Sequence, residues 1–535
     1  MNDILWGFLR QSNPVDSPRW GSGPFTGGSR PSSRSQIDGA PPGHPCRPAT
    51  LAKPAFAPLA LHRIVCQTVS RRFAQSLGFG IRIASARLMK HYPSIILRSL
   101  APQPTWVQPQ QSIDSPDQGN HPQVGPTQPA TNQKALIDFS SNDYLSLSLS
   151  PQLRNIIKDR LLLSDEPLLG PSSSRLLDGN TALHRKLEDH LTDFFIGKSG
   201  LLFNTGFDAN VGIWSTLPAA NDWVLYDSQI HASVHDGLRL SRTPSNHRIP
   251  FSHNSVAALE SNLSAILATD VEVRAGRASV FVSVESLYSM DGDLCPLEEM
   301  CCLLENLFKS HRNAYLIVDE AHSTGLYGPS GRGLVCALSL ADRVLIRLHT
   351  FGKAAACSGA IVIAPILIRD YLINYARPLI FSTVMNRMNV IALDCIISEF
   401  KSDRRHHAAL QLEQLCRHLA TKLGLLLSKH HITPVEAESS RPPHVLLTVP
   451  RTVISPMPSG FFSPIIPILS QRPRELARFL YHKGCLLRPI GTPTVPTGRE
   501  QVRVCIHASQ SIDQIDYLVE QLERWIIKHS SFHHL

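Results

Sequence analysis

The sequence has no hydrophobic run long enough to cross a membrane. Its longest apolar stretch, residues 359–368, has about ten residues, whereas a membrane-spanning helix needs about 18 or more. We therefore expect no membrane span. Cysteine occurs without a pattern, since the 11 cysteines are an odd number and include no C-x-x-C pair. This excludes a disulfide-stabilised miniprotein and favours reduced thiols in an intracellular compartment.

Most of the chain also lacks a large net charge, because its positive and negative residues are nearly equal in number. The 535 residues carry a net charge of +9. Residues 1–133 hold 13 Lys/Arg against 5 Asp/Glu, whereas residues 134–535 hold 39 against 38. A nucleic-acid-binding surface needs a cluster of positive charge. We therefore expect no nucleic-acid partner for residues 134–535.

Residues 1–133 are predicted to lack a folded core. They contain 18 of the 40 prolines, and neither 17–50 nor 102–133 has the apolar periodicity needed to offset the entropy of ordering. Residues 63–100 contain seven basic residues and no acid, which is the composition of a mitochondrial transit peptide. Three interpretations stay open: a targeting extension, a disordered tail, or an upstream region wrongly joined to the gene, with Met89 as an alternative start.

From residue 134 onward, apolar strand patterns alternate with helical patterns. We predict strands at 201–204, 223–227, 279–285, 315–319, 344–348 and 360–364. Such alternation over some 200 residues is typical of an α/β fold, with a parallel sheet covered by helices on both faces. In sheets of this kind, ligands bind outside the carboxyl ends of the strands.

The pattern changes after about residue 386, which predicts a smaller C-terminal α+β domain. Its expected elements are a long helical stretch over 386–427, strands at 442–449, 484–487 and 501–507, and a final helix at 511–528, with a four-proline loop at 456–467. The predicted organisation is a basic, Pro-rich extension (1–133), an N-terminal arm and linker (134–190), a large domain (191–385) and a small domain (386–535).

Polar residues capable of chemistry follow three of the predicted strands. Asp227 ends one strand and precedes His231, and Asp319 ends another and precedes His322. Lys353 follows a third strand and lies among small residues. Each has an ordinary structural explanation when taken alone: a helix cap for the aspartates, core packing for the histidines, the surface for the lysine. Their combination at strand ends predicts a catalytic site.

Eight sequence blocks in a fixed order lie within residues 138–525. They are Phe139-Ser-Ser-Asn-Asp-Tyr-Leu145, Ser174-Arg-Leu-Leu-Asp-Gly179, Asn204-Thr-Gly-Phe-Asp-Ala-Asn210, His231-Ala-Ser233, Glu285-Ser-Leu-Tyr-Ser-Met-Asp-Gly-Asp293, Val318-Asp-Glu-Ala-His-Ser-Thr-Gly325, Thr350-Phe-Gly-Lys353 and Pro493-Thr-Val-Pro496. This region resembles the α-oxoamine synthases, a family of pyridoxal 5'-phosphate (PLP) enzymes with the type I, aspartate-aminotransferase-like fold. The resemblance implies a PLP-dependent acyltransferase with a large parallel or mixed-sheet domain and a smaller C-terminal α+β domain.

The resemblance also implies how the PLP ring is held. Lys353 would bind PLP covalently, Asp319 would pair with the pyridinium nitrogen, and His231 would stack on the ring. His322 and Ser289 would hydrogen-bond the phenolic oxygen. Lys353, His231 and Asp319 are accordingly the predicted catalytic residues.

The PLP phosphate would be bound by a second group of residues. Gly206 and Phe207 would present backbone N–H groups at a helix N-terminus, and Thr350 would add a hydroxyl. Ser382 and Thr383 resemble the block that reaches the phosphate of the neighbouring subunit. A homodimer with shared active sites is therefore implied.

The implied substrates are an amino acid and an acyl-CoA. Arg503 would hold the amino-acid carboxylate through a bidentate pair, and Thr494, Asn142 and Arg175 would be further substrate residues. Within the family, the first and last blocks favour members that condense L-alanine with pimeloyl-CoA. The products would be 8-amino-7-oxononanoate, CoA and CO2, in biotin biosynthesis.

The chain departs from the family pattern on the acyl-CoA side. Gly170-Pro-Ser-Ser-Ser-Arg175 replaces a glycine-rich block, and Ala354-Ala-Ala-Cys357 replaces the usual Gly-Phe-Gly after the lysine. Two alternatives therefore stay open. One is a related α-oxoamine synthase that uses glycine or another acyl-CoA, including enzymes of secondary metabolism. The other is a catalytically inactive partner protein with the same fold.

Two further expectations concern the compartment and metals. The C-terminal His533-His534-Leu535 resembles the peroxisomal Ser-Lys-Leu signal only weakly, so cytoplasm, peroxisome and mitochondrion stay open. The histidine pairs at 406–407 and 430–431 have no third ligand at a fitting spacing, so no metal site is predicted.

Overall fold

The computed structural model of the chain describes residues 136–164, 167–436, 439–457 and 460–530. The predicted extension (1–133) and the C-terminal His-His-Leu tripeptide lie outside the described residues.

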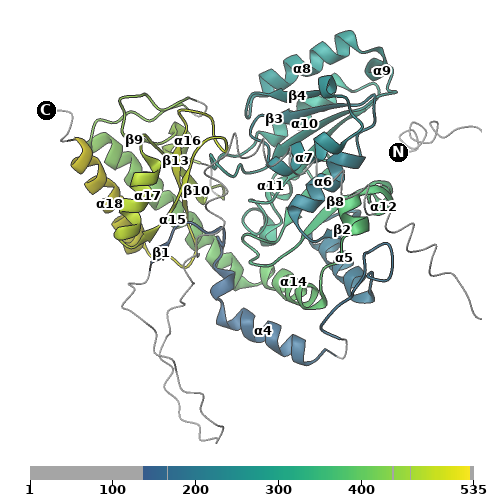
Figure 1. Ribbon diagram of the computed structural model, residues 1–535, viewed down its shortest axis with the longest axis horizontal. Coiled ribbons are helices and arrows are strands. Elements are labelled where there is room, and N and C mark those ends of the chain that lie inside the picture. The colour runs from purple at the N-terminus through teal and green to yellow at the C-terminus, as the bar shows by residue number, and fades with distance from the viewer. Residues whose placement is uncertain (1–135, 165–166, 437–438, 458–459, 531–535) are drawn as a thin grey trace, which may run out of the picture. The chain divides into compact units, whose positions relative to one another are not determined.

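The large domain is built on a seven-stranded sheet with the order β2-β8-β7-β6-β5-β3-β4 (Figure 1). Its strands are β2 (Ser199–Phe203), β3 (Trp223–Asp227), β4 (Arg248–Phe251), β5 (Val280–Glu285), β6 (Ala314–Asp319), β7 (Ile346–Thr350) and β8 (Ala360–Ala364). β8 runs antiparallel to both of its neighbours, β2 and β7, and the pairs from β7 to β4 are parallel. The predicted α/β class is therefore confirmed, with a mixed sheet.

Helices cover both faces of this sheet because successive strand residues are buried on opposite sides. Leu202 and Val282 belong to one apolar core, whereas Leu201 and Phe281 belong to the other. The first core is completed by α5 (Ala182–Phe194), α8 (Val256–Thr269) and α10 (Leu297–Leu307). The second is completed by α6 (Gly206–Thr216), α7 (Ala232–Leu240), α12 (Ile366–Tyr375) and α13 (Arg377–Phe381). This two-sided burial explains why the strands are nearly continuous apolar runs.

The C-terminal region forms a four-stranded antiparallel sheet with the order β12-β13-β10-β9. Its strands are β9 (Leu447–Thr448), β10 (Ile465–Ser470), β12 (Arg488–Ile490) and β13 (Gln501–Cys505). A separate parallel pair joins β1 (Ile137–Asp138) to β11 (Cys485–Leu486). The first described strand therefore pairs with a strand almost 350 residues later in the chain.

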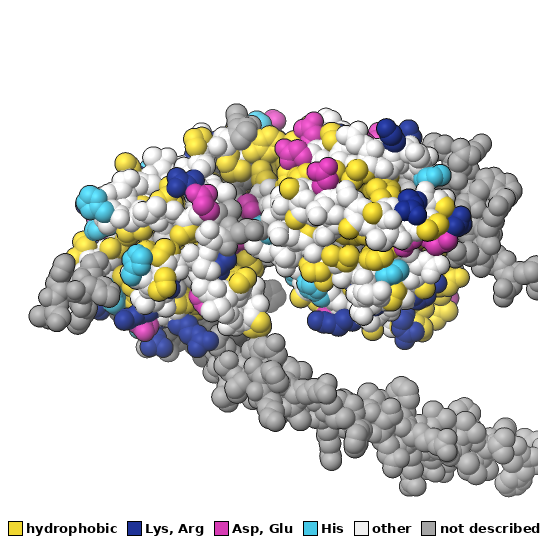
Figure 2. Space-filling model, turned by 90° about the horizontal axis from the view of Figure 1, so that it is seen from above, with side chains coloured by type: hydrophobic (Ala, Val, Ile, Leu, Met, Phe, Trp, Pro, Cys, Tyr) yellow, Lys and Arg dark blue, Asp and Glu magenta, His cyan; other side chains and the backbone are white. Residues whose placement is uncertain are grey.

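The other helices connect or cover these sheets. They are α4 (Pro151–Leu162), α9 (Val271–Arg274), α11 (Leu334–Ala337), α14 (Arg387–Phe400), α15 (Asp403–Lys429), α16 (Arg451–Ile454), α17 (Pro473–His482) and α18 (Ile512–Ser530). None of the helices in the described ranges is long and apolar enough to cross a membrane. On the face seen in Figure 2, acidic and basic side chains are interspersed among apolar ones.

Several expectations for the C-terminal region were wrong in detail. The predicted loop at 456–467 contains the start of β10, and Pro467 lies inside that strand opposite Arg503. β9 pairs only with the last two residues of β10, so Pro467 lies where one side of the strand has no partner and a missing N–H is tolerated.

The boundaries of other strands and helices also differ from those predicted. Of the predicted strand at 442–449, only Leu447–Thr448 pairs. The helical stretch over 386–427 is two helices, because Ser402 caps α15 by accepting a hydrogen bond from the Arg405 backbone N–H. The short strands β4 and β12 were not predicted.

Candidate active site

Four strands of the large sheet end in polar residues, as a ligand site at the carboxyl ends requires. The last residues of β3, β5, β6 and β7 are Asp227, Glu285, Asp319 and Thr350. Glu285 and Asp319 are direct partners in the β5–β6 register. Lys353 follows β7 by three residues, so it lies beside these carboxyl groups.

The Lys353 amine is shifted toward its neutral form. Burial lowers the pKa of Lys353, and the positive charge of Arg503 lowers it further. The carboxylates of Asp319 and Glu285 raise it, but the net shift is downward. Because only the neutral amine attacks a carbonyl carbon, this environment favours nucleophilic chemistry by Lys353.

Asp319 is held rigidly by two hydrogen bonds. Its Oδ2 accepts from Asn210 Nδ2 at 2.8 Å, and its Oδ1 accepts from the Ala321 backbone N–H at 2.9 Å. Asn210, on α6, also donates to Ser233 Oγ at 3.0 Å, and Ser233 Oγ lies 2.7 Å from His231 Nδ1. Asn210 and Ser233 therefore connect the two predicted catalytic residues Asp319 and His231.

His231 is the N-cap residue of α7 and presents an exposed ring. Although the residue is exposed, desolvation by the groups around it lowers the pKa of His231, and the carboxylate of Asp319 partly offsets this. The ring of Phe207 meets it edge-on, with 6.3 Å between centroids. An exposed, largely neutral imidazole beside Asp319 and Lys353 suits the ring-stacking role predicted for His231.

A second network joins the N-terminal arm to the C-terminal sheet. Asn142 Oδ1 accepts from Arg503 Nη2 at 3.0 Å and from Tyr144 Oη at 3.1 Å. Tyr144 Oη lies 2.8 Å from His322 Nδ1. Burial, together with the charges of Lys353 and Arg503, lowers the pKa of His322 well below its usual value. The structure therefore brings the predicted residues Asn142, His322 and Arg503 together.

Tyr144 and Glu285 were missed as individual site residues, although both lie in the sequence blocks that carry the family resemblance. Glu285 is buried, and its carboxyl accepts a hydrogen bond from the His231 backbone N–H. Its Oε1 has no partner among the described residues. Burial and the nearby Asp319 raise the pKa of Glu285 to about 8. The sequence signals for Glu285 were its place at the end of an apolar strand and at the start of a family block.

The predicted phosphate-binding residues meet at the start of α6, which begins at Gly206. Thr205 caps this helix by accepting from the Asp208 backbone N–H at 3.0 Å. A Cβ on Gly206 would lie 2.3 Å from Thr350 Cγ2. This close approach requires glycine at 206 and places the Thr350 side chain at the helix N-terminus, where backbone N–H groups favour an anion.

We expect Gly206→Ala to weaken PLP binding about tenfold or more, or about 1.4 kcal/mol. The added methyl group would displace Thr350 or the start of α6. Titration of the apoprotein with PLP, followed by absorbance, measures this change. The double variant Gly206→Ala/Thr350→Ser should recover affinity, because serine keeps the hydroxyl and lacks Cγ2.

The matched control is Gly424→Ala, in α15, where a Cβ would meet only Ile454 at an ordinary 4.0 Å. Equal PLP affinity of wild type and Gly206→Ala would contradict the predicted role of this helix N-terminus.

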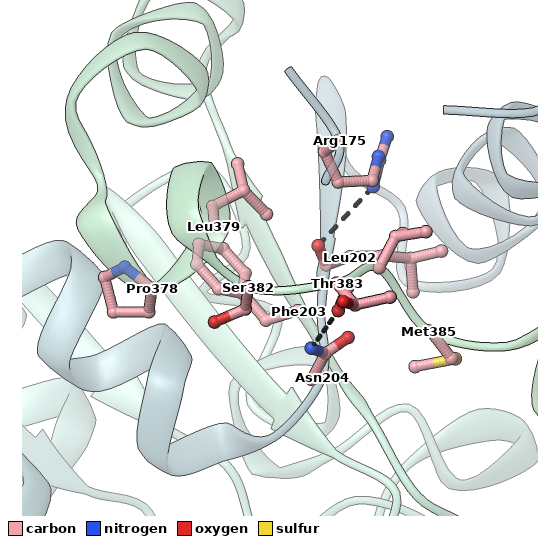
Figure 3. Close-up of a pocket in the computed structure, with 10 residues that line it drawn as sticks. Arg175, Leu202, Phe203, Asn204, Pro378, Leu379, Ser382, Thr383 and Met385 are labelled. Carbon is pink, nitrogen blue, oxygen red and sulfur yellow. Dashed lines mark hydrogen bonds between the residues drawn. The ribbon is translucent and has the colours of Figure 1, made fainter. Parts of the chain in front are cut away.

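Ser382, Thr383 and Arg175 line a small pocket beside β2 (Figure 3). Thr383 is exposed, and its carbonyl accepts a hydrogen bond from Asn204 Nδ2 at 2.7 Å. Arg175 is already engaged, because its guanidinium forms a bidentate pair with Glu188 at 2.8 and 3.0 Å and donates to Asn180. Most of the Arg175 donors are therefore engaged within the fold, and its substrate role stays a prediction.

The other predicted residues lie on loops. Thr494 is exposed in the turn between β12 and β13. Ser289 is half-buried in the loop after β5. In the same loop Ser286 is fully buried and donates to Ser323 Oγ at 2.8 Å. The described contacts bring neither Ser289 nor Thr494 to the group around Lys353.

The residues at this sheet edge fit PLP on their own chemistry. Lys353 supplies an amine of lowered pKa, Asp319 an anchored carboxylate for a ring nitrogen, and Gly206 an open helix N-terminus for a phosphate. This arrangement on a mixed α/β sheet defines a PLP-dependent enzyme of the type I fold.

Comparisons with known proteins agree with that class. The model of the aminotransferase class I and II family matches residues 134–522. An 8-amino-7-oxononanoate synthase from Emericella nidulans is 41% identical over 397 residues, covering 73% of this chain and 89% of the relative. An aminoacyl transferase sphA from Byssochlamys spectabilis is 30% identical over 388 residues, covering 72% and 80%.

A solved variant of serine palmitoyltransferase from S. paucimobilis with a bound PLP-myriocin aldimine has the same fold, with a TM-score of 0.60 and 24% identity, covering 74% of this chain and 88% of that one. The chain belongs to the α-oxoamine synthase family and is a PLP-dependent acyltransferase. The family and cofactor predictions are confirmed.

Proposed function

We propose that the chain condenses L-alanine with pimeloyl-CoA to give 8-amino-7-oxononanoate, CoA and CO2. The observation that carries the reaction type is the meeting of the Lys353 amine, the Asp319 carboxylate and the Arg503 guanidinium around one site. Support for this substrate pair comes from the 41% identity over 397 residues to the Emericella nidulans relative, an 8-amino-7-oxononanoate synthase.

Each side chain of this site has its own role in the proposed reaction. Arg503, held by Asn142, binds the amino-acid carboxylate and orients the α-carbon. Lys353 then removes the α-proton as a general base. When bound, PLP supplies an electron sink for the electron pair left on that carbon. The carbon attacks the thioester and expels CoA, the carboxylate leaves as CO2, and Lys353 returns a proton to the product.

We also propose that the protein is a homodimer in which Ser382 and Thr383 reach the partner's phosphate site. Large apolar side chains lie 70% to 80% exposed at the end and C-cap of α4, on the segment 167–177 and at the end of α13: Leu162, Leu163, Leu169, Leu177 and Phe381. Arg387 binds the Leu169 carbonyl at 3.0 Å, so this segment lies beside the start of α14. Exposed apolar groups of this size are typical of an interface, and sedimentation at micromolar concentration measures the dimer.

A second candidate is another amino-acid and acyl-CoA pair within the same family. The specific observation in its favour is the likeness to aminoacyl transferase sphA. A second observation in its favour is the altered loop Gly170–Arg175, because the family resemblance implies that this loop lies on the acyl-CoA side.

The test is CoA release by the purified, PLP-loaded protein. We expect turnover with L-alanine and pimeloyl-CoA, and none with glycine or L-serine or with palmitoyl-CoA. Turnover only with another pair would move the protein to the second candidate. PLP binding without turnover on any pair would favour an inactive partner protein and contradict both.

A further inference from the structure

The Asp291 carboxylate joins two segments that are distant in the sequence. Its Oδ1 accepts from Arg499 Nη2 at 2.9 Å, and its Oδ2 accepts from Gln229 Nε2 at 2.8 Å. The Asp291 and Arg499 side chains are only 8% and 4% exposed. A buried ion pair of this kind is strongly destabilising to break, because the remaining charge loses its partner.

Each of the three residues lies close to a predicted active-site residue. Asp291 comes two residues after Ser289, and Gln229 comes two residues before His231. Arg499 comes four residues before Arg503 and two residues before the start of β13. The Asp291 carboxylate therefore connects three parts of the chain: the loop that contains His231, the loop that contains Ser289, and the segment that leads into the Arg503 strand.

Neighbouring contacts hold the same loop against the C-terminal sheet. Gln501, on β13, donates from Nε2 to the Met290 carbonyl at 2.9 Å. Gly292 has a φ of +69°, and a Cβ there would lie 2.0 Å from the Ile465 carbonyl oxygen of β10. Residues 290–292 are thus packed directly on β10 and β13.

The far end of the loop is anchored in the large domain. Asp293 Oδ2 lies 2.9 Å from His253 Nε2, and His253 Nδ1 lies 2.8 Å from Asp227 Oδ1. The two carboxylates raise the pKa of His253 to about 10, despite its burial, so the His253 imidazole stays protonated at neutral pH. The loop is therefore fixed to the large domain at Asp293 and to the C-terminal sheet at Asp291.

We propose that Asp291 is a positioning residue that sets the place of Arg503 relative to His231 and so controls amino-acid affinity. The inference rests on the proposed function, in which Arg503 binds the amino-acid carboxylate. Arg503 reaches the site from β13, whereas Lys353, Asp319 and His231 belong to the large domain. A salt bridge between the two parts, four residues from Arg503, fixes the distance that a bidentate carboxylate contact requires.

The test uses Asp291→Asn and Arg499→Met in the full-length, PLP-loaded protein. L-alanine, glycine and L-serine are each titrated while the absorbance of bound PLP is followed. We expect both variants to need at least tenfold more amino acid for the half-maximal change. PLP affinity and the KM for pimeloyl-CoA should stay within twofold of wild type. The double variant should be no weaker than either single one, because the two side chains act as one unit.

The matched control is Ile468→Val, which loses a methyl group at a fully buried position of β10 without touching Asp291. It should lower stability and leave the titration unchanged. If Asp291→Asn does not fold, Asp291→Glu keeps the charge but shifts the guanidinium, and the same tenfold criterion applies.

If the variants give the same titration curves as the wild type, this inference is wrong and the proposed function still stands. An equal loss of PLP affinity would also overturn it, because it would show a general structural role. Absence of any response in the wild type itself would instead refute the proposed function, and this inference with it.

Discussion

Replacement of Lys353 by alanine should reduce turnover by about 10³-fold or more. The variant loses both the amine that binds PLP and the general base, and general-base catalysis alone contributes about 10²- to 10⁴-fold. Burial lowers the pKa of Lys353, which favours the neutral amine that both of these roles require. CoA release measures turnover, and borohydride reduction followed by mass spectrometry locates the covalently bound PLP.

The control for this variant is Lys198→Ala. Lys198 precedes β2, and its side chain is 61% exposed, so its loss should change neither turnover nor the site of PLP attachment. Borohydride labelling of a peptide without residue 353 in the wild type would contradict the assignment. Substantial turnover by Lys353→Ala would do the same.

Asp319→Asn should lower turnover by about 10²- to 10³-fold, the range found when one preorganised electrostatic partner is removed from an active site. Asparagine can still accept a hydrogen bond from Asn210 or from the Ala321 N–H. It carries no negative charge, however, and cannot hold a proton on the ring nitrogen of PLP. Steady-state kinetics measure the loss, and a changed absorbance of bound PLP should accompany it.

Asp222→Asn provides a closely matched control. Asp222 is also a buried aspartate that accepts two backbone hydrogen bonds, from Ala219 and Ser279, both at 2.8 Å. It immediately precedes β3, so it lies at the amino ends of the parallel strands, whereas Asp319 lies at their carboxyl ends. The control should lose stability without losing turnover per folded molecule. Equal kinetics for the two variants would show that the Asp319 charge has no special role.

Strand positions in the large domain were readable from the sequence because they depend on local pattern. β3 and β8 occupy the predicted residues, 223–227 and 360–364. A strand buried on both faces must be apolar throughout, so it stands out from polar flanking segments. Polar residues directly after such strands, Asp319 above all, are also local signals, because parallel strands end at one edge.

The C-terminal sheet was less predictable because its strands are short and one of them contains proline. Pro467 suggested a loop, yet β10 accommodates it opposite Arg503, beyond the short pairing with β9. Whether a proline can lie in a strand depends on which side has a partner. Sequence pattern does not contain that information.

The sequence by itself determined the α/β class, the strand ends that carry Asp319 and Lys353, and the family to which they belong. Tertiary structure alone decided how Asn142 meets Arg503 across 361 residues of chain, and how Asp291 joins Gln229 to Arg499. Tertiary structure also turned Arg175 toward Glu188. The physical reason is that local periodicity and propensity act over a few residues, whereas hydrogen bonds between distant segments depend on the order and packing of the sheets.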